Sequence, residues 1–151
     1  MKQHVIDTTN NAQIVIKKVL YTGNVHITGG REGAARSNDG RLDINLSTPG
    51  GPGAGTNPEQ LFAAGWSACF IGAMRHNAAA LSITIPADTA IDAEVDLATA
   101  EDGFHLQARL NVSLLGLSAE DATRLVEAAH QTCPYSKATR GNINVQINVV
   151  V

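Results

Sequence analysis

The stretch from residue 56 to residue 80, TNPEQLFAAGWSACFIGAMRHNAAA, decides the fold expected for this chain. Asn57 is suited to cap a helix, Pro58 to occupy its first position, and Glu59 to face the positive end of the helix dipole. Beyond Glu59 the stretch is mainly small and apolar and holds a single charged residue. A surface helix would carry a continuous polar face. The stretch therefore predicts a buried central helix from Pro58 to about residue 80.

Three strands are expected before this helix. Residues 13–28 are rich in β-branched side chains, and glycines at 29, 30 and 33 predict a turn before a second strand at 34–37. The tripeptide Asn38-Asp39-Gly40 is a strong hairpin signal, and apolar side chains alternate after it at Leu42, Ile44 and Leu46. Four glycines and two prolines within residues 49–55 predict a loop that leads into the helix.

Two strands, a second helix and a last strand are expected after the central helix. The strands at 91–98 and 105–114 flank the turn sequence Glu101-Asp102-Gly103. Ser118 is placed to cap the second helix, with Asp121 completing a capping box, and Pro134 ends that helix. Apolar residues alternate with polar ones over 143–149, as in a half-buried strand. The order βββ-α-ββ-α-β predicts an α+β domain with a largely antiparallel sheet.

The length of 151 residues fits one globular domain, which we assign to residues 13–151, with residues 1–12 as a flexible extension. Eleven Lys and Arg against 14 Asp and Glu give a formal net charge of -3, so no basic field is available for nucleic acid or an anionic membrane surface. Apolar runs fall far short of the ~20 residues of a membrane span. The first residues lack the apolar core of a signal peptide, so we expect a cytoplasmic protein.

The sequence offers no motif for a metal or a nucleotide. Its five histidines are scattered, and neither a CxxC nor an HExxH motif is present, so we expect no metal site. His130 precedes Cys133 by three residues on one helix face, but a packed or solvated helix histidine is the simpler interpretation. The glycine-rich loop lacks the Lys-Ser/Thr pair of a P-loop, and no GxGxxG follows the first strand. We therefore expect no bound cofactor.

Two cysteines, Cys69 and Cys133, are the candidate chemical groups. In a reducing compartment such a pair is either buried packing or redox chemistry. Cys69 lies in the middle of the apolar helix, where burial raises a thiol pKa, so it would need a nearby cation to act as a nucleophile. Cys133 lies at the end of the second helix and suits a second, resolving thiol. From the residues alone, packing and catalysis both remain open.

Three segments carry a resemblance to a known family. They are GGREG at 29–33, GTNPEQLFAAGWSACF at 55–70, and AHQTCPYSKATRGN at 129–142. In this order they resemble the organic hydroperoxide resistance (Ohr) branch of the Ohr/OsmC family. The resemblance implies an OsmC-like fold, an intertwined homodimer, and a thiol peroxidase that reduces organic hydroperoxides to alcohols. It also implies recycling by an external dithiol such as dihydrolipoamide on a lipoylated protein.

The resemblance also implies a role for each matching residue. Cys69 matches the peroxidatic cysteine and Cys133 the resolving one. Arg31 matches the arginine that activates the thiolate, and Glu59 the glutamate that pairs with that arginine. An apolar wall would favour alkyl or lipid hydroperoxides over hydrogen peroxide. The residues expected to form it are Phe62, Trp66, Phe70 and Ile71.

One distance constrains how these groups can meet. Glu59 and Cys69 are ten residues apart on the predicted helix, about 15 Å along its axis. We therefore expect either a bend between them or an active site that takes Glu59, with or without Arg31, from the partner subunit. Trp66 is a departure from the family pattern, because tyrosine is common at this position in Ohr proteins.

Three other functions stay open at this stage. The sibling OsmC branch shares the thiol mechanism and would differ in substrate preference. A non-catalytic dimer that binds a small molecule would use the cysteines only for packing. A thiol redox sensor would form the Cys69–Cys133 bridge but turn over poorly. Lys137 and Arg140, beside Cys133, would suit an acidic dithiol partner or a solvated turn.

Overall fold

The computed structural model of the protein describes residues 3–6 and 14–151. The elements in chain order are β1 (Val25–Thr28), the 3-10 helix η1 (Gly30–Glu32), β2 (Ala34–Ser37), β3 (Asp43–Asn45), α1 (Pro58–Ala78), β4 (Ala90–Ala100), β5 (Gly103–Ser113), α2 (Ala119–Thr132), α3 (Pro134–Thr139) and β6 (Asn144–Val150). They form two three-stranded sheets with strand orders β1-β2-β3 and β4-β5-β6. The expected α+β class is confirmed.

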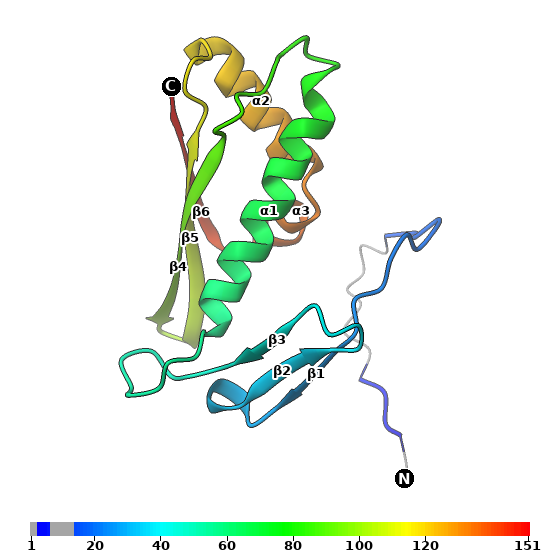
Figure 1. The fold of residues 1–151 in the computed structure, drawn as a ribbon, viewed down its shortest axis with the longest axis vertical. Helices are drawn as coiled ribbons and strands as arrows, with labels where there is room; N and C mark the ends of the chain where they lie inside the picture. Colours follow the sequence, from blue (N-terminus) through cyan, green and yellow to red (C-terminus); the bar gives the residue numbers. More distant parts are fainter. Residues whose placement is uncertain (1–2, 7–13) are drawn as a thin grey trace.

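Helix α1 is the centre of the fold, as its sequence predicts. The Asn57 side chain accepts a hydrogen bond from the Gln60 main-chain N–H at 2.9 Å, and Pro58 occupies the first turn. Trp66, Phe70 and Met74 have no exposed surface. Burying a side chain of this size contributes about 1.5–3 kcal/mol relative to leaving it in water. Figure 1 shows α1 lying along one face of the β4-β5-β6 sheet, with α2 and α3 beside it.

The C-terminal sheet is mixed, with one antiparallel and one parallel strand pair. Strands β4 and β5 form an 11-residue hairpin, whereas β5 and β6 run parallel. A parallel neighbour requires a crossover connection. Helices α2 and α3 provide that crossover between β5 and β6.

A third helix was not expected from the sequence. Pro134 ends α2, as predicted, but it also opens the six-residue helix α3. Proline suits the first position of a helix because its missing N–H would have no partner there. At the other end of α2, the Ser118 hydroxyl accepts from the Asp121 N–H at 3.1 Å. The Asp121 carboxylate accepts instead from Arg124 at 2.9 Å, so the capping box is formed only in part.

The first predicted strand is much shorter than expected. Only Val25–Thr28 pairs with β2, while residues 14–24 have no regular secondary structure and are exposed. The β-branched side chains there favour a strand, but β2 has four residues and offers no partner further along. Gln13 lies outside the described residues, as does most of the extension assigned to 1–12. The described residues 3–6 of that extension have no regular structure.

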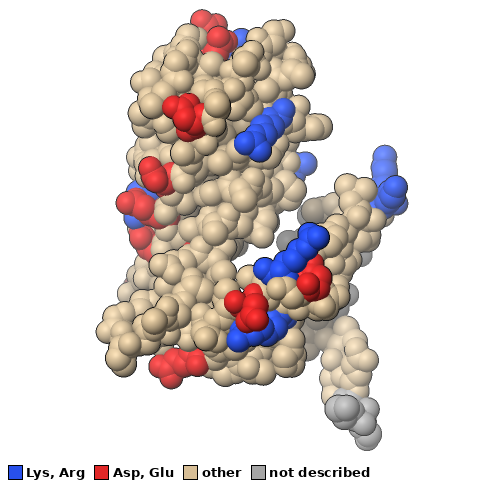
Figure 2. Space-filling model, viewed as in Figure 1, with Lys and Arg blue, Asp and Glu red and all other residues tan. Residues whose placement is uncertain are grey.

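The β1-β2-β3 sheet extends away from the rest of the chain, near the N-terminal end of α1 (Figure 1). Its side chains are largely exposed, with Ala35 as its one buried strand residue. Figure 2 shows that the face presented by α1 above this sheet is almost free of charged side chains. Among the described helices, none is long and apolar enough to span a bilayer.

Candidate active site

The two cysteines meet although 64 residues separate them. The Cys133 Sγ lies 3.4 Å from the Cys69 Sγ, and both thiols are free. Helix α1 supplies Cys69, and the junction between α2 and α3 supplies Cys133. Cys133 is fully buried, whereas Cys69 is partly exposed. A reagent from solvent therefore reaches Cys69 first.

The surroundings of Cys69 within one chain do not favour a thiolate. Burial is the main cause that raises the pKa of the Cys69 thiol, and the hydrogen bond with the Cys133 thiol raises it further. The main-chain N–H of Tyr135 donates to Cys69 and lowers that pKa in part. Arginine is not among the groups that shift it. A cation must approach before this thiol becomes a strong nucleophile at neutral pH.

Arg31 and Glu59 form a separate, bidentate ion pair. Arg31 Nη2 lies 2.6 Å from Glu59 Oε1, and Arg31 Nη1 lies 2.9 Å from Glu59 Oε2. The hydrogen bonds from Arg31 lower the pKa of the Glu59 carboxyl and fix its charge. Glu59 is 12% exposed, and the Arg31 side chain is 41% exposed. The guanidinium is therefore oriented by the carboxylate and still open to a further ligand.

A tight glycine turn presents Arg31. Gly29 has φ 68°, in the left-handed region, and its carbonyl accepts the Glu32 N–H. A Cβ on Gly33 would lie 1.7 Å from the Thr28 carbonyl oxygen, so a side chain does not fit at that position. The GGREG segment is thus required in order to fold η1 back onto β2 with Arg31 at its turn.

The two pairs do not meet within one chain. Helix α1 runs without a break from Pro58 to Ala78, so the expected bend is not what brings Glu59 and Cys69 together. A cavity of about 760 Å³ lies beside the ion pair. It is lined by Arg31, Thr48, Pro49, Asn57, Glu59, Gln60, Ala63, Ala93, Glu94, Val95, Asp96, Leu97 and Arg109. Cys69 does not line it.

A smaller cavity, of about 350 Å³, is lined by the same ion pair. Besides Arg31 and Glu59, its lining includes the apolar side chains of Phe62, Leu97, Phe104 and Leu106. Of the four residues of the expected apolar wall, Phe62 lines this cavity. Three of the cavity's apolar residues come from the β4–β5 hairpin, which the motifs did not indicate.

The other three residues of the expected wall are placed in or against the core. Trp66 and Phe70 have no exposed surface, so within this chain they are core residues and do not line a substrate pocket. Ile71 is half-buried and packs against the same core. The physical reason is that α1 turns these residues toward the β4-β5-β6 sheet and the neighbouring helices, where the largest apolar area is buried.

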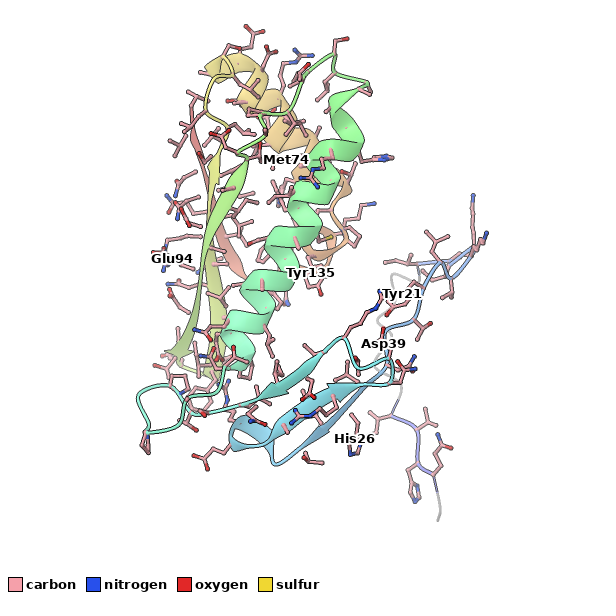
Figure 3. All side chains as sticks on the ribbon, in the orientation of Figure 1. Tyr21, His26, Asp39, Met74, Glu94 and Tyr135 are labelled. Carbon is pink, nitrogen blue, oxygen red and sulfur yellow. The ribbon has the colours of Figure 1, made fainter. Side chains whose placement is uncertain are left out.

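Tyr135 and Ser136 are site residues that the sequence reasoning missed. The Tyr135 ring lies edge-on to Phe62 with centroids 6.2 Å apart. A Cβ on Gly65 would lie 3.1 Å from the Tyr135 hydroxyl, so the glycine makes room for the ring beside α1. Figure 3 shows Tyr135 between α1 and α3. The Ser136 hydroxyl accepts from Trp66 Nε1 at 3.2 Å. Both residues follow Cys133-Pro134 directly. The sequence analysis took Pro134 only as the end of the second helix, so it did not predict that Tyr135 and Ser136 lie on a third helix.

His130 has a structural contact. Arg140 donates to the His130 main-chain carbonyl, and its Nε lies 3.4 Å from His130 Nε2. Burial, and then the charge of Arg140, lower the pKa of His130. The contact ties the end of α3 to α2. Within the described part of the chain, no three His, Cys, Asp or Glu side chains are grouped so that they could hold a metal ion.

Comparison with known proteins identifies the family of this chain. The family model of OsmC-like proteins matches residues 50–148. The organic hydroperoxide resistance protein of Xanthomonas axonopodis pv. citri is 48% identical over 137 residues, which cover 88% of this chain and 96% of that protein.

Solved structures give the same result. The crystal structure of the organic hydroperoxide resistance protein OhrB of Bacillus subtilis superposes with a TM-score of 0.82 at 44% identity, covering 87% of this chain and all of that one. The corresponding protein of Legionella pneumophila has a TM-score of 0.82 at 45% identity, covering 89% of this chain and all of that one. The chain therefore belongs to the OsmC-like family, and within it to the branch whose members are named organic hydroperoxide resistance proteins.

Proposed function

We propose that the protein is a cysteine-based peroxidase that reduces organic hydroperoxides to alcohols. The observation that carries this proposal is the 3.4 Å contact between the Cys69 and Cys133 sulfurs, with the first partly exposed and the second buried. Inert packing thiols need no such pairing across 64 residues. Relatives named for organic hydroperoxide resistance, 42–48% identical to the chain, support the same class of substrate.

The first step is attack on the peroxide by Cys69. The Cys69 thiolate attacks the terminal oxygen of ROOH, the O–O bond breaks, and the alkoxide leaves as an alcohol after taking up one proton. Cys69 is oxidised to a sulfenic acid. Arg31, held by Glu59, lowers the thiol pKa and donates hydrogen bonds to the peroxide oxygens as negative charge develops on them.

The second step closes a disulfide. The Cys133 sulfur attacks the sulfenic sulfur of Cys69, an S–S bond forms, and the hydroxyl group leaves as water. An external dithiol, such as dihydrolipoamide on a lipoylated protein, then reduces the disulfide by two exchange steps and becomes a disulfide itself.

This chemistry requires a homodimer in which each active site is composite. The Arg31–Glu59 pair and the Cys69–Cys133 pair do not touch within a chain, and Cys69 lacks a cation there. Helix α1 also leaves small residues exposed, at Ala64, Ala68 and Gly72. A helix this apolar on all sides belongs in an interior. A second copy packed on that face would cover it and bring its Arg31–Glu59 pair to Cys69.

The 350 Å³ cavity at the Arg31–Glu59 pair supports a substrate with an organic tail. Phe62, Leu97 and Phe104 line it together with Arg31. Burying a methylene group there gains about 0.8 kcal/mol. Hydrogen peroxide has no tail and gains nothing from this surface, so alkyl and lipid hydroperoxides are the favoured substrates.

The test is a single turnover of the reduced protein under anaerobic conditions. One equivalent of cumene hydroperoxide should consume two thiols and lower the intact mass by two hydrogens, and hydrogen peroxide should react more slowly. In Cys133→Ser the reaction should stop at a sulfenic acid on Cys69. Thiols that stay reduced with both peroxides would refute the peroxidase and favour a binding protein.

Steady-state turnover separates the enzyme from a sensor. With excess dihydrolipoamide and cumene hydroperoxide, an enzyme consumes peroxide continuously. A redox sensor would take up one oxidising equivalent per chain and stop.

A further inference from the structure

We propose that the hydrogen bond between Trp66 and Ser136 is a positioning device for disulfide formation. It holds α3 so that the Cys133 sulfur stays against Cys69, and it thereby sets the rate of the second step. Trp66 and Ser136 are positioning residues, because neither has an exposed surface at which a peroxide could bind. This inference rests on the proposed function for its role in turnover, but its structural basis does not depend on the substrate.

Helix α3 depends on contacts with other elements to keep its position. It is six residues long, and a helix of that length is not stable by itself. Its buried residues are Ser136 and Thr139, so its inward side consists of hydroxyl groups in place of apolar side chains. The Thr139 hydroxyl bonds back to the Tyr135 carbonyl of its own helix. Ser136 reaches across to another element, since Trp66 lies on α1.

The hydrogen bond and the cysteine pair form two adjacent links between the same segments. Trp66 and Cys69 are three residues apart on α1, and so lie on one face one turn apart. Cys133 and Ser136 are also three residues apart, and their segment runs antiparallel to α1, so Trp66 meets Ser136 and Cys69 meets Cys133. The links are therefore Trp66–Ser136 at 3.2 Å and Cys69–Cys133 at 3.4 Å.

Because the two contacts join the same segments, the position of the Cys133 sulfur depends on the Trp66–Ser136 hydrogen bond. Trp66 and Ser136 have no exposed surface, so water cannot replace either partner without opening the core. If the hydrogen bond is lost, α3 keeps its attachment to α2 through Arg140 and His130 and its Tyr135 N–H bond to Cys69, but it loses a buried side-chain hydrogen bond to α1. The Cys133 sulfur then spends less time at the contact from which it attacks.

The experiment measures the two chemical steps separately in Trp66→Phe, Ser136→Ala and the double variant. With one equivalent of cumene hydroperoxide, loss of the first thiol reports the attack by Cys69, and loss of the second reports disulfide closure. We expect closure to slow about 3- to 10-fold in each single variant, the effect of one lost hydrogen bond, with the first step changed less than twofold. The double variant should be no slower than either single one, because both remove the same interaction.

Thr139→Val is the matched control, since it removes the other buried hydroxyl of α3 without touching α1. It should close its disulfide at the wild-type rate. Thermal unfolding checks that each variant folds, and Trp66, as the single tryptophan of the chain, reports its own surroundings by fluorescence in Ser136→Ala. If Trp66→Phe does not fold, Ser136→Ala still tests the proposal.

Closure driven by diamide separates this inference from the proposed function, because diamide oxidises thiol pairs without a peroxide. Slow closure of both variants with diamide would support the positioning role even if no peroxide reacted. Closure at the wild-type rate in Ser136→Ala, with either oxidant, would overturn it.

Discussion

Cys69 shows how far a residue's own surroundings determine its chemistry. Its burial and its contact with Cys133 raise its thiol pKa, which opposes the reactivity that the proposed peroxidase needs. The bidentate contact with Glu59 holds Arg31 as a fixed cation with a free edge. The proposed peroxidase therefore still needs a guanidinium at the Cys69 sulfur, and Arg31 is one that Glu59 already orients.

Arg31→Ala should therefore slow the reaction with cumene hydroperoxide about 100-fold or more, the typical effect of removing one donor to developing negative charge. A guanidinium beside Cys69 lowers the pKa of its thiol, so removing it should also move the midpoint of the pH–rate profile to higher pH. Stopped-flow measurements from pH 5 to 10 would test this.

Arg124→Ala is the control for that variant, since Arg124 pairs with Asp121 on α2, away from the cysteines. It should leave both the rate and the midpoint unchanged. An Arg31→Ala variant with a lower rate but an unmoved midpoint would show that Arg31 does not act on the thiol.

At the scale of the elements, the β4–β5 hairpin contains a network of hydrogen bonds and ion pairs around the carboxylate of Asp96. Arg109 on β5 donates to both oxygens of Asp96 on β4, at 2.8 and 3.0 Å, and Gln107 donates to Asp96 at 2.7 Å. These contacts lower the pKa of Asp96 from 3.8 to about 2. A carboxyl whose pKa is depressed in the folded state stabilises that state above its unfolded pKa and loses the effect as the pH falls through the folded pKa.

Asp96→Asn should accordingly lower the urea midpoint at pH 7, and the difference from wild type should vanish between pH 4 and pH 2. Asp92→Asn is a control on the same strand and face, because in the described part of the chain Asp92 has no ion-pair partner. A difference that persists undiminished at pH 2 would mean that the ion pair is not its cause.

At the scale of the whole molecule, the exposed small-residue face of α1 should be the contact between two copies. A Cβ on Gly72 meets nothing within 4 Å in one chain, so Gly72→Glu should fold. In a dimer it would bury an unpaired charge on this face. We expect a monomer by light scattering, loss of peroxide turnover, and retained closure of the Cys69–Cys133 disulfide with diamide.

Thr123→Glu, on the exposed side of α2, places the same charge away from α1 and should remain dimeric and active. A Gly72→Glu protein that stays dimeric with full turnover would exclude this face of α1 as the interface.

Mixing two inactive variants tests whether the active site is shared between subunits. Arg31→Ala lacks the cation and Cys69→Ser lacks the nucleophile. After subunit exchange at a 1:1 ratio, half of the dimers are mixed, and each contains one complete site if Arg31 acts on the partner's cysteine. Turnover should therefore recover to about a quarter of the wild-type value. If Arg31 acts within its own chain, the mixture should stay as inactive as its components.

Much of the fold followed from local signals. Asn57-Pro58 begins α1, Gly40 and Gly103 lie in the turns of two hairpins, and alternation identifies β6. Each of these depends on a few adjacent residues and on rules of capping or pleating. The strand predicted over 13–28 failed beyond β1 because strand formation needs a partner, which those residues lack in one chain.

The sequence by itself determined which chemical groups make up the candidate site and which elements carry them. Its motifs indicated Cys69, Cys133, Arg31 and Glu59, and the structure joins them as two pairs. Only the tertiary structure decided that these pairs stay apart in one chain, that Trp66 is buried against Ser136, and that α3 lies over the Cys69 face of α1. The reason is physical: residue types and helical spacing fix what a segment can do, but distances between segments far apart in sequence depend on how their surfaces pack.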